Sequence, residues 1–203
     1  MSSLVVVSHS DPNSLTHHVA RSTIDALVDA GDTVEFADLA AENFDPRFTR
    51  ADLDLFRGTG TLDADIASEQ ARVDRADHLV LVFPMYWWSM PAQLKGWIDR
   101  VFINGWAFDD SPDTGFVKKL GRLTIHLVAV AADDADSFGR HGIDQAFSIQ
   151  IERGIVEYVG ATLGSSTFLH ESETKSRETL AAEVNVIADA IATRVSGRAT
   201  VDA

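Results

Sequence analysis

Apolar residues along the chain fall into short continuous runs and into longer stretches with helical spacing. Runs rich in Val and Leu predict strands buried on both faces of a sheet. Stretches in which apolar residues recur every three or four positions predict helices with one buried side. The predicted strands are Ser3–Val7, Asp32–Leu39, Leu79–Phe83, Leu123–Val130 and Ala161–His170. The predicted helices are residues 15–30, 63–76, 91–102, 143–159 and 180–195.

The alternation of five strands with helices predicts one α/β domain. It favours a parallel sheet with right-handed crossovers and helices on both faces. Five strands favour the flavodoxin-like order 2-1-3-4-5, a three-layer sandwich, over the six-stranded order. We expect residues 1–195 to form this domain and residues 196–203 to form a flexible tail. Residues 42–60 and 104–121 show neither a continuous apolar run nor helical spacing of apolar residues, so they are expected to be irregular. Residues 131–139 are expected to form an acidic loop.

Composition narrows the range of partners. The 203 residues carry a formal net charge of −14, which argues against a nucleic-acid partner. The chain has no cysteine, so disulfides and thiolate chemistry are excluded. No apolar run approaches the roughly 20 residues of a membrane helix, and the N-terminus lacks the basic segment of a signal peptide. We therefore expect a cytoplasmic protein without direct membrane insertion.

The loop after the first predicted strand, Ser8–Thr16, is the first candidate site. It contains no glycine, which excludes the dinucleotide fingerprint and the Walker loop. Its hydroxyl groups and the free N–H groups at the start of the next helix suit a phosphate, and His9 offers a further donor. The alternative is that Ser14 is only a helix N-cap and His9 only a surface residue.

The loop after the third predicted strand, Met85–Ser89, is the second candidate site. It holds three consecutive aromatic residues, Tyr86, Trp87 and Trp88. A flat, electron-poor ring could lie along this backbone, with the aromatic side chains as walls. The alternative is that the indoles only pack against the protein. Neighbouring side chains of an extended segment point in opposite directions, so at least one of the three should be exposed or lie at an interface.

The sequence gives little support for a metal site or for a hydrolytic active site. The aspartates at 133, 134 and 136 lack the position pattern of a calcium loop, so a solvated turn is favoured and no metal is expected. His17 and His18 are adjacent on a helix and do not share a face. The chain has neither His-Glu-x-x-His nor Gly-x-Ser-x-Gly. A bound cofactor is therefore the natural carrier of reactivity.

The segment Phe83–Phe102 resembles the signature of the NAD(P)H:quinone oxidoreductases of flavodoxin-like fold, which include modulator of drug activity proteins and ancillary subunits of potassium efflux systems. The first loop resembles that family's flavin-phosphate loop. The resemblance implies a homodimer with flavin at the subunit interface, FAD being favoured over FMN. It also implies hydride transfer from NAD(P)H to the flavin and then to a quinone. The residues carried over are His9, Ser14, Leu15 and Thr16 for the phosphate, Pro84, Met85, Tyr86, Trp87 and Trp88 for the flavin ring, Gln70 near the cofactor, and Trp106 and Phe108 as walls of the substrate pocket.

The chain departs from this family after the fourth predicted strand. Val130–Asp133 replaces a Thr-Thr-Gly-Gly loop, Phe138 stands near a Tyr that assists hydride transfer, and Asp144 stands near a His. His141 is the candidate substitute for that His, so Phe138, His141 and Asp144 are the candidate catalytic residues. Two other functions remain open: a regulatory subunit of a transporter with incidental reductase activity, and a one-electron carrier like the flavodoxins.

Overall fold

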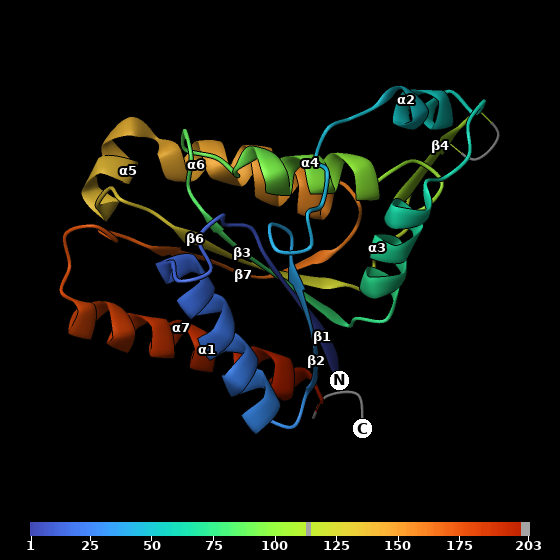
Figure 1. The fold of residues 1–203 in the computed structure, drawn as a ribbon. Helices are drawn as coiled ribbons and strands as arrows, with labels where there is room; N and C mark the ends of the chain where they lie inside the picture. Colours follow the sequence, from blue (N-terminus) through green and yellow to red (C-terminus); the bar gives the residue numbers. More distant parts are fainter. Residues whose placement is uncertain (113–114, 200–203) are drawn as a thin grey trace.

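The computed structural model, which describes residues 1–112 and 115–199, contains a five-stranded parallel sheet with helices on both faces (Figure 1). Its strands are β1 (Ser2–Val7), β2 (Thr33–Asp38), β3 (His78–Pro84), β6 (Thr124–Val130) and β7 (Thr162–Leu169). They lie in the order β2-β1-β3-β6-β7, and all neighbours pair in parallel. Numbered within this sheet, the order is 2-1-3-4-5, so the predicted flavodoxin-like topology is confirmed.

The central strands are buried on both faces, as their continuous apolar runs predict. In β1, Leu4 and Val6 join the core on one face, while Val5 and Val7 join the core on the other. Helices α1 (Leu15–Asp29) and α7 (Arg177–Ala199) cover the Val5 face. Helices α3 (Ala64–Asp74), α4 (Ala92–Val101) and α6 (Ile143–Phe147) cover the opposite face. The result is the expected three-layer sandwich.

A short helix, α2 (Arg50–Phe56), lies where the sequence predicted only irregular chain. It starts with a capping box in which Thr49 and Asp52 satisfy each other's backbone N–H groups. Asp52 also accepts a hydrogen bond from Arg100 Nε of α4 at 3.1 Å, and both side chains are buried. Capping and a buried ion pair hold this helix, which is why apolar spacing did not reveal it.

Residues 104–121 also differ from the expected irregular segment. They contain an antiparallel hairpin of β4 (Phe108–Ser111) and β5 (Gly115–Lys118). Phe108 packs against Phe116 and Tyr158, with ring centroids 5.8 and 5.4 Å away. The hairpin is stabilised by aromatic contacts with a distant helix, which short-range periodicity cannot report.

The predicted helix 143–159 is helical, but its register changes. After α6 it continues as the π-helix η1 (Ser148–Glu157). The buried residues are Ile151 and Val156, five positions apart, whereas the α-helical spacing had placed Ile155 and Tyr158 on the inner face. The wider turn brings Val156 inward and leaves Tyr158 exposed to meet the hairpin.

The two remaining differences concern chain ends and loops. The predicted acidic loop 131–139 is interrupted by helix α5 (Ala135–His141), which Asp134 caps by accepting from Ser137 N at 2.6 Å. Helix α7 runs to Ala199, so residues 196–199 of the expected tail are helical, and residues 200–203 lie outside the described residues. Within the described ranges, no helix is both long enough and apolar enough to cross a membrane.

Candidate functional site

The two candidate loops lie side by side at the carboxyl edge of the sheet. Ser8 N, at the start of the first loop, donates to the Val82 carbonyl of β3 at 3.2 Å. Met85 N, at the start of the second loop, donates to the Val130 carbonyl of β6 at 2.8 Å. Ligands of open α/β sheets bind at this edge. The parallel register therefore brings together segments that are about 70 residues apart along the chain.

Trp87 and Trp88 form the centre of a tight two-residue turn. Tyr86 and Ser89 exchange two backbone hydrogen bonds of 3.0 Å each, and the two tryptophans have φ angles of +51° and +58°. Such turns normally carry Asn-Gly, because side chains disfavour positive φ. Left-handed backbone costs of order 1–3 kcal/mol per residue and persists mainly at functional sites. The turn leaves Trp87 fully exposed, which confirms that one of the three aromatics must face outward.

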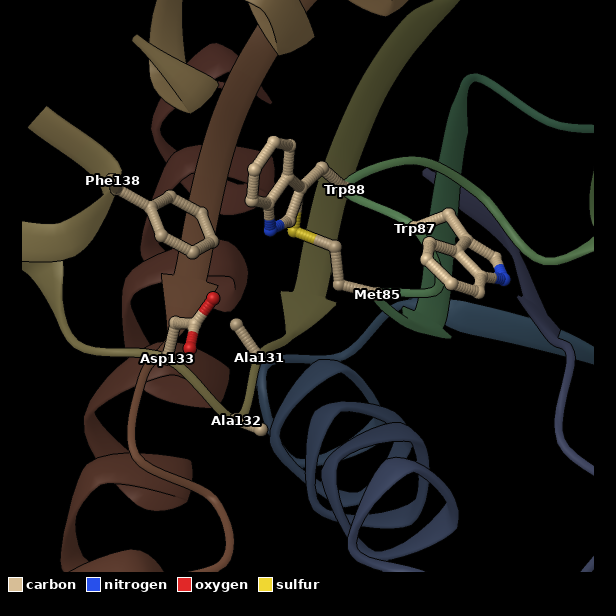
Figure 2. Close-up of a pocket in the computed structure, with 7 residues that line it drawn as sticks. All are labelled: Met85, Trp87, Trp88, Ala131, Ala132, Asp133 and Phe138. Atoms are coloured by element: carbon tan, nitrogen blue, oxygen red, sulfur yellow. The ribbon is translucent and has the colours of Figure 1, made fainter. Parts of the chain in front are cut away.

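A cavity of about 400 Å³ lies between this turn and the chain that follows β6. Figure 2 shows Met85 and Trp88 on one side and Phe138 and Asp133 on the other, and Trp87 lines the cavity from the exposed end of the turn. The other lining residues are Ala131 and Ala132. The walls are mainly apolar and the Asp133 carboxylate is the charged group among them, a composition typical of small-molecule sites.

The three candidate catalytic residues occupy different positions around this cavity. Phe138 is buried and lines it. His141 is exposed and stacks on Trp88, with ring centroids 5.9 Å apart and planes 20° apart, so it stands at the rim. Asp144 is exposed and is not one of the residues that line the cavity. Behind Phe138 stands His170, which the sequence analysis missed: its ring lies 4.6 Å from Phe138, and its Nδ1 lies 3.1 Å from the Asp133 carbonyl.

The first loop has the form expected of an anion site. Ser14 is the N-cap of α1 and accepts from His17 N at 3.2 Å. His9 accepts the Asp11 N–H on Nδ1 at 3.0 Å, which leaves its Nε2 as a donor. Leu15 is half-buried and Thr16 is buried in the first turn of the helix. The free N–H groups of this turn and the helix dipole favour negative charge.

His17 and Asp38 were not among the predicted site residues. His17 is 1% exposed, and its Nε2 lies 2.8 Å from Asp38 Oδ2 at the end of β2. Its Nδ1 lies 3.0 Å from Ser14 Oγ. The informative spacing in the sequence is the three residues from Ser14 to His17, and not the adjacency of His17 and His18. Asp38 could not be paired with either from the sequence, because β2 meets α1 only in the folded chain.

Three other predicted residues lie away from the cavity within this chain. Gln70 is buried and its side-chain amide donates to the Val101 carbonyl at 3.0 Å, joining α3 to α4. Trp106 packs on Phe102 at 5.9 Å, and Phe108 lines a second cavity of about 610 Å³ on a different part of the surface. One chain alone therefore does not bring Trp106 and Phe108 to the Met85–Ser89 loop.

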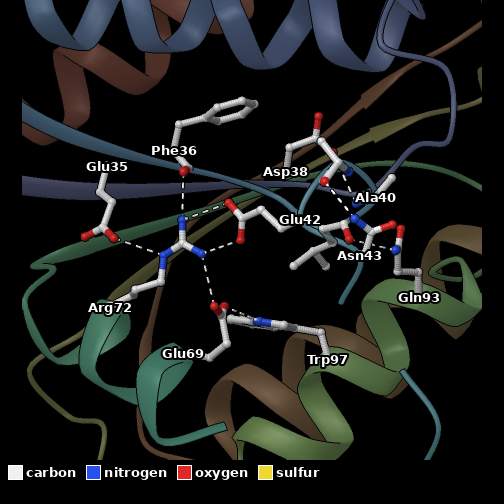
Figure 3. Close-up of polar contacts among 12 residues, drawn as sticks. Glu35, Phe36, Asp38, Ala40, Glu42, Asn43, Glu69, Arg72, Gln93 and Trp97 are labelled. Carbon is white, nitrogen blue, oxygen red and sulfur yellow. Dashed lines mark hydrogen bonds and ion pairs between the residues drawn. The ribbon is translucent and has the colours of Figure 1, made fainter. Parts of the chain in front are cut away.

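A charged network supports the helix that follows the aromatic turn (Figure 3). Trp97 of α4 donates to Glu69 at 2.7 Å, and Glu69 pairs with Arg72 at 3.0 Å. Arg72 also pairs with Glu35 and Glu42 at 2.9 and 2.6 Å. Burial lowers the pKa of Arg72, but its hydrogen bonds to Glu42 and Glu69 outweigh this effect and raise the pKa above its ordinary value. This network fixes α4 against α3 and β2.

The arrangement fits a flavin. Its ring requires a flat apolar slot, which Met85, Trp88 and Phe138 border, and the cavity volume lies within the range of small-molecule sites. Its phosphate requires donors near that slot, which the adjoining first loop supplies through Ser14 and the start of α1.

Comparison with known proteins identifies the family and supports the fold. A family model described as flavodoxin-like fold matches residues 1–191. Ribosyldihydronicotinamide dehydrogenase [quinone] of Mus musculus is 34% identical over 178 residues, covering 77% of this chain and 76% of the mouse protein. An uncharacterized NAD(P)H oxidoreductase of Escherichia coli (strain K12) is 30% identical over 166 residues, covering 81% of each chain. The solved NAD(P)H:quinone oxidoreductase from Methanothermobacter marburgensis has a TM-score of 0.83 at 21% identity, covering 96% of each chain, and so supports the fold. The chain therefore belongs to the flavodoxin-like fold family, as do these oxidoreductase relatives.

Proposed function

We propose that this protein is a flavin-dependent NAD(P)H oxidoreductase that passes hydride to a quinone or a similar two-electron acceptor. The observation that carries the proposal is the apolar cavity between the strained Trp87-Trp88 turn and the chain after β6, with an anion-type loop beside it. The names of the mouse and Escherichia coli relatives support it. They give no support to a transporter subunit.

In this proposal the bound flavin supplies the hydride chemistry, and the chain supplies binding, orientation and exclusion of water. Ser14 and the first turn of α1 hold the phosphate. Met85 and Trp88 hold the ring from one side, and Phe138 narrows the slot from the other. Since one cavity serves both substrates, oxidised nicotinamide must leave before the quinone enters.

Proton handling falls to the rim of the cavity. Phe138 has no hydroxyl, so it contributes shape and not a proton. His141, stacked on Trp88, is the group placed to hold a proton at an imidazole nitrogen while a quinone oxygen gains negative charge. Asp144 lies at the start of α6, separated from His141 by the left-handed Gly142, and it faces solvent outside the cavity, so it does not act on the ring itself.

We propose FAD as the cofactor, with FMN as the alternative, because the first loop resembles that of the FAD-binding members. We also propose a homodimer in which Trp106 and Phe108 of one subunit wall the cavity of the other. The exposed aromatic side chains around Phe108 and the apolar cavity beside it support a covered surface there. A cytoplasmic location, where NAD(P)H is supplied, belongs to the same proposal.

The proposal is tested by purifying the protein and titrating it with FAD, FMN and riboflavin while recording absorption and flavin fluorescence. We expect a yellow complex that NADH or NADPH bleaches and that a quinone reoxidises. Trp88→Ala should weaken flavin binding, whereas the matched control Trp106→Ala should affect it only in the dimer. Sedimentation separates the two oligomeric states, and chromatography of heat-released flavin separates FAD from FMN. Absence of flavin binding at micromolar protein would refute the proposal.

A further inference from the structure

We propose that His17 and Asp38 form a proton relay behind Ser14, which couples binding of the flavin phosphate to uptake of one proton by His17. The two residues act through Ser14 and are positioning residues. The inference rests on the proposed function, because the anion concerned is the phosphate of the flavin.

The geometry places three side chains in line. Ser14 Oγ lies 3.0 Å from His17 Nδ1, and His17 Nε2 lies 2.8 Å from Asp38 Oδ2. The other oxygen of Asp38, Oδ1, accepts the N–H groups of Ala40 and Ala41 at 3.2 and 3.1 Å (Figure 3). Asp38 is therefore held with Oδ2 facing the imidazole. His17 is buried and Ser14 is half-buried, so the relay runs from the interior to the first loop.

Hydrogen-bond accounting fixes the direction of the relay when His17 is neutral. A carboxylate only accepts, so His17 Nε2 carries the ring proton and donates it to Asp38. Nδ1 is then an acceptor, and the single proton of the Ser14 hydroxyl is donated to it. The same hydroxyl oxygen accepts from His17 N. In this state Ser14 has no proton left to donate to a phosphate oxygen.

Uptake of a proton by His17 reverses the direction of the hydrogen bond between His17 Nδ1 and Ser14 Oγ. Both ring nitrogens are then donors: Nε2 donates to Asp38, and Nδ1 donates to Ser14 Oγ. The Ser14 hydroxyl proton becomes free to turn toward a phosphate. The imidazolium also places a positive charge between the Asp38 carboxylate and the incoming anion. The proton comes from solvent, and no covalent bond other than the N–H bond is formed.

Other ionisable groups face this site from the elements around it. Asp38 approaches from the end of β2. His9, on the first loop, has its ring 6.2 Å from that of His17, edge to face. Arg21 of α1 donates to the Pro12 carbonyl of the loop at 2.8 Å, so it adds positive charge at the loop's outer side. A phosphate bound here would favour proton uptake at either histidine, and variants must separate the two.

Asp38→Asn gives the sharpest test, because it keeps the shape of the side chain and changes which nitrogen of His17 carries the ring proton. Oδ1 of the new Asn can still accept from Ala40 and Ala41, so its NH₂ group faces His17. It donates to Nε2, and the neutral ring must then carry its proton on Nδ1. His17 donates to Ser14 without any uptake, and the Ser14 hydroxyl is free for the phosphate at any pH.

The experiment is calorimetric titration of the apoprotein with FMN from pH 6 to 8.5, in buffers of different ionisation enthalpy. Wild type should take up about one proton on binding at the alkaline end, and its affinity should fall by up to about tenfold per pH unit there, the limit for one linked proton. Asp38→Asn and His17→Gln should bind FMN with no proton uptake and a flat profile. His9→Gln should keep the uptake. Riboflavin, which has the ring but no phosphate, should bind wild type without uptake.

The outcomes separate the relay from the proposed function. If FAD, FMN and riboflavin all fail to bind, the proposed function fails. If FMN binds wild type without proton uptake, or if Asp38→Asn takes up the same proton as wild type, the relay is wrong although flavin binding stands. If His9→Gln abolishes the uptake and His17→Gln does not, the proton belongs to His9, and the relay is again refuted.

Discussion

Replacement of Trp97 by Phe tests whether the buried network in Figure 3 holds α4 in place. Trp97 is completely buried in α4, and its indole N–H donates to the Glu69 carboxylate at 2.7 Å. Glu69 is itself buried and pairs with Arg72. Trp97→Phe removes the donor and part of the ring but keeps an aromatic side chain at the position.

The expected cost has two parts. A hydrogen bond to a charged acceptor contributes about 1.5–3 kcal/mol, and its loss leaves one carboxylate oxygen of Glu69 without the indole donor. The smaller ring leaves a cavity of roughly 40 Å³, which costs about 1 kcal/mol at 24 cal/mol per Å³. We therefore expect Trp97→Phe to lower the free energy of unfolding by about 2.5–4 kcal/mol.

Urea denaturation followed by far-UV circular dichroism measures this loss without depending on tryptophan fluorescence. Trp106→Phe is the matched control, because its indole donates to Asp74 at 3.2 Å at an exposed site. It should cost less than about 1 kcal/mol. If the two variants lose the same stability, the hydrogen bond from Trp97 to Glu69 contributes nothing measurable and the reasoning is refuted.

Two further predictions concern an ion pair and the strained turn. Burial raises the pKa of Asp52, but hydrogen bonds from Thr49 and Arg100 outweigh this and lower the pKa below its usual value. A lowered folded pKa gives stability that is present above the unfolded value near 3.9 and is lost as pH falls through the folded value. Asp52→Asn should thus cost about 3–5 kcal/mol at pH 7, and thermal melts should show this gap closing below about pH 4; a pH-independent gap would contradict it. Trp87→Asn should raise stability by about 0.5–1 kcal/mol, since Asn tolerates left-handed backbone, while weakening flavin binding; urea and flavin titrations check both, and a destabilised variant would show that the turn is not strained.

Local sequence patterns predicted the five strands of the sheet and most of its helices. They failed for segments whose structure depends on contacts with residues far away in the chain. The continuous runs around Val80 and Leu127 could only be central strands, because both of their faces are buried. Helix α2 escaped prediction because a capping box and its pair with Arg100 hold it. The change to a π-helix after Phe147 escaped because the spacing of Ile151 and Val156 becomes meaningful only against the sheet that they pack on.

For the site, the sequence by itself determined the two loops, their aromatic and hydroxyl side chains, and their place after buried strands. That followed from residue type and order, which any parallel α/β sheet converts into one shared edge. Only the tertiary structure decided that Trp87 and Trp88 adopt left-handed backbone, that His170 stands behind Phe138, and that Asp38 meets His17. The turn is local, but Trp-Trp lacks the Asn-Gly signal of such turns. The two pairings depend on distances between segments that are far apart in the chain, and no local pattern of polar and apolar residues encodes such distances.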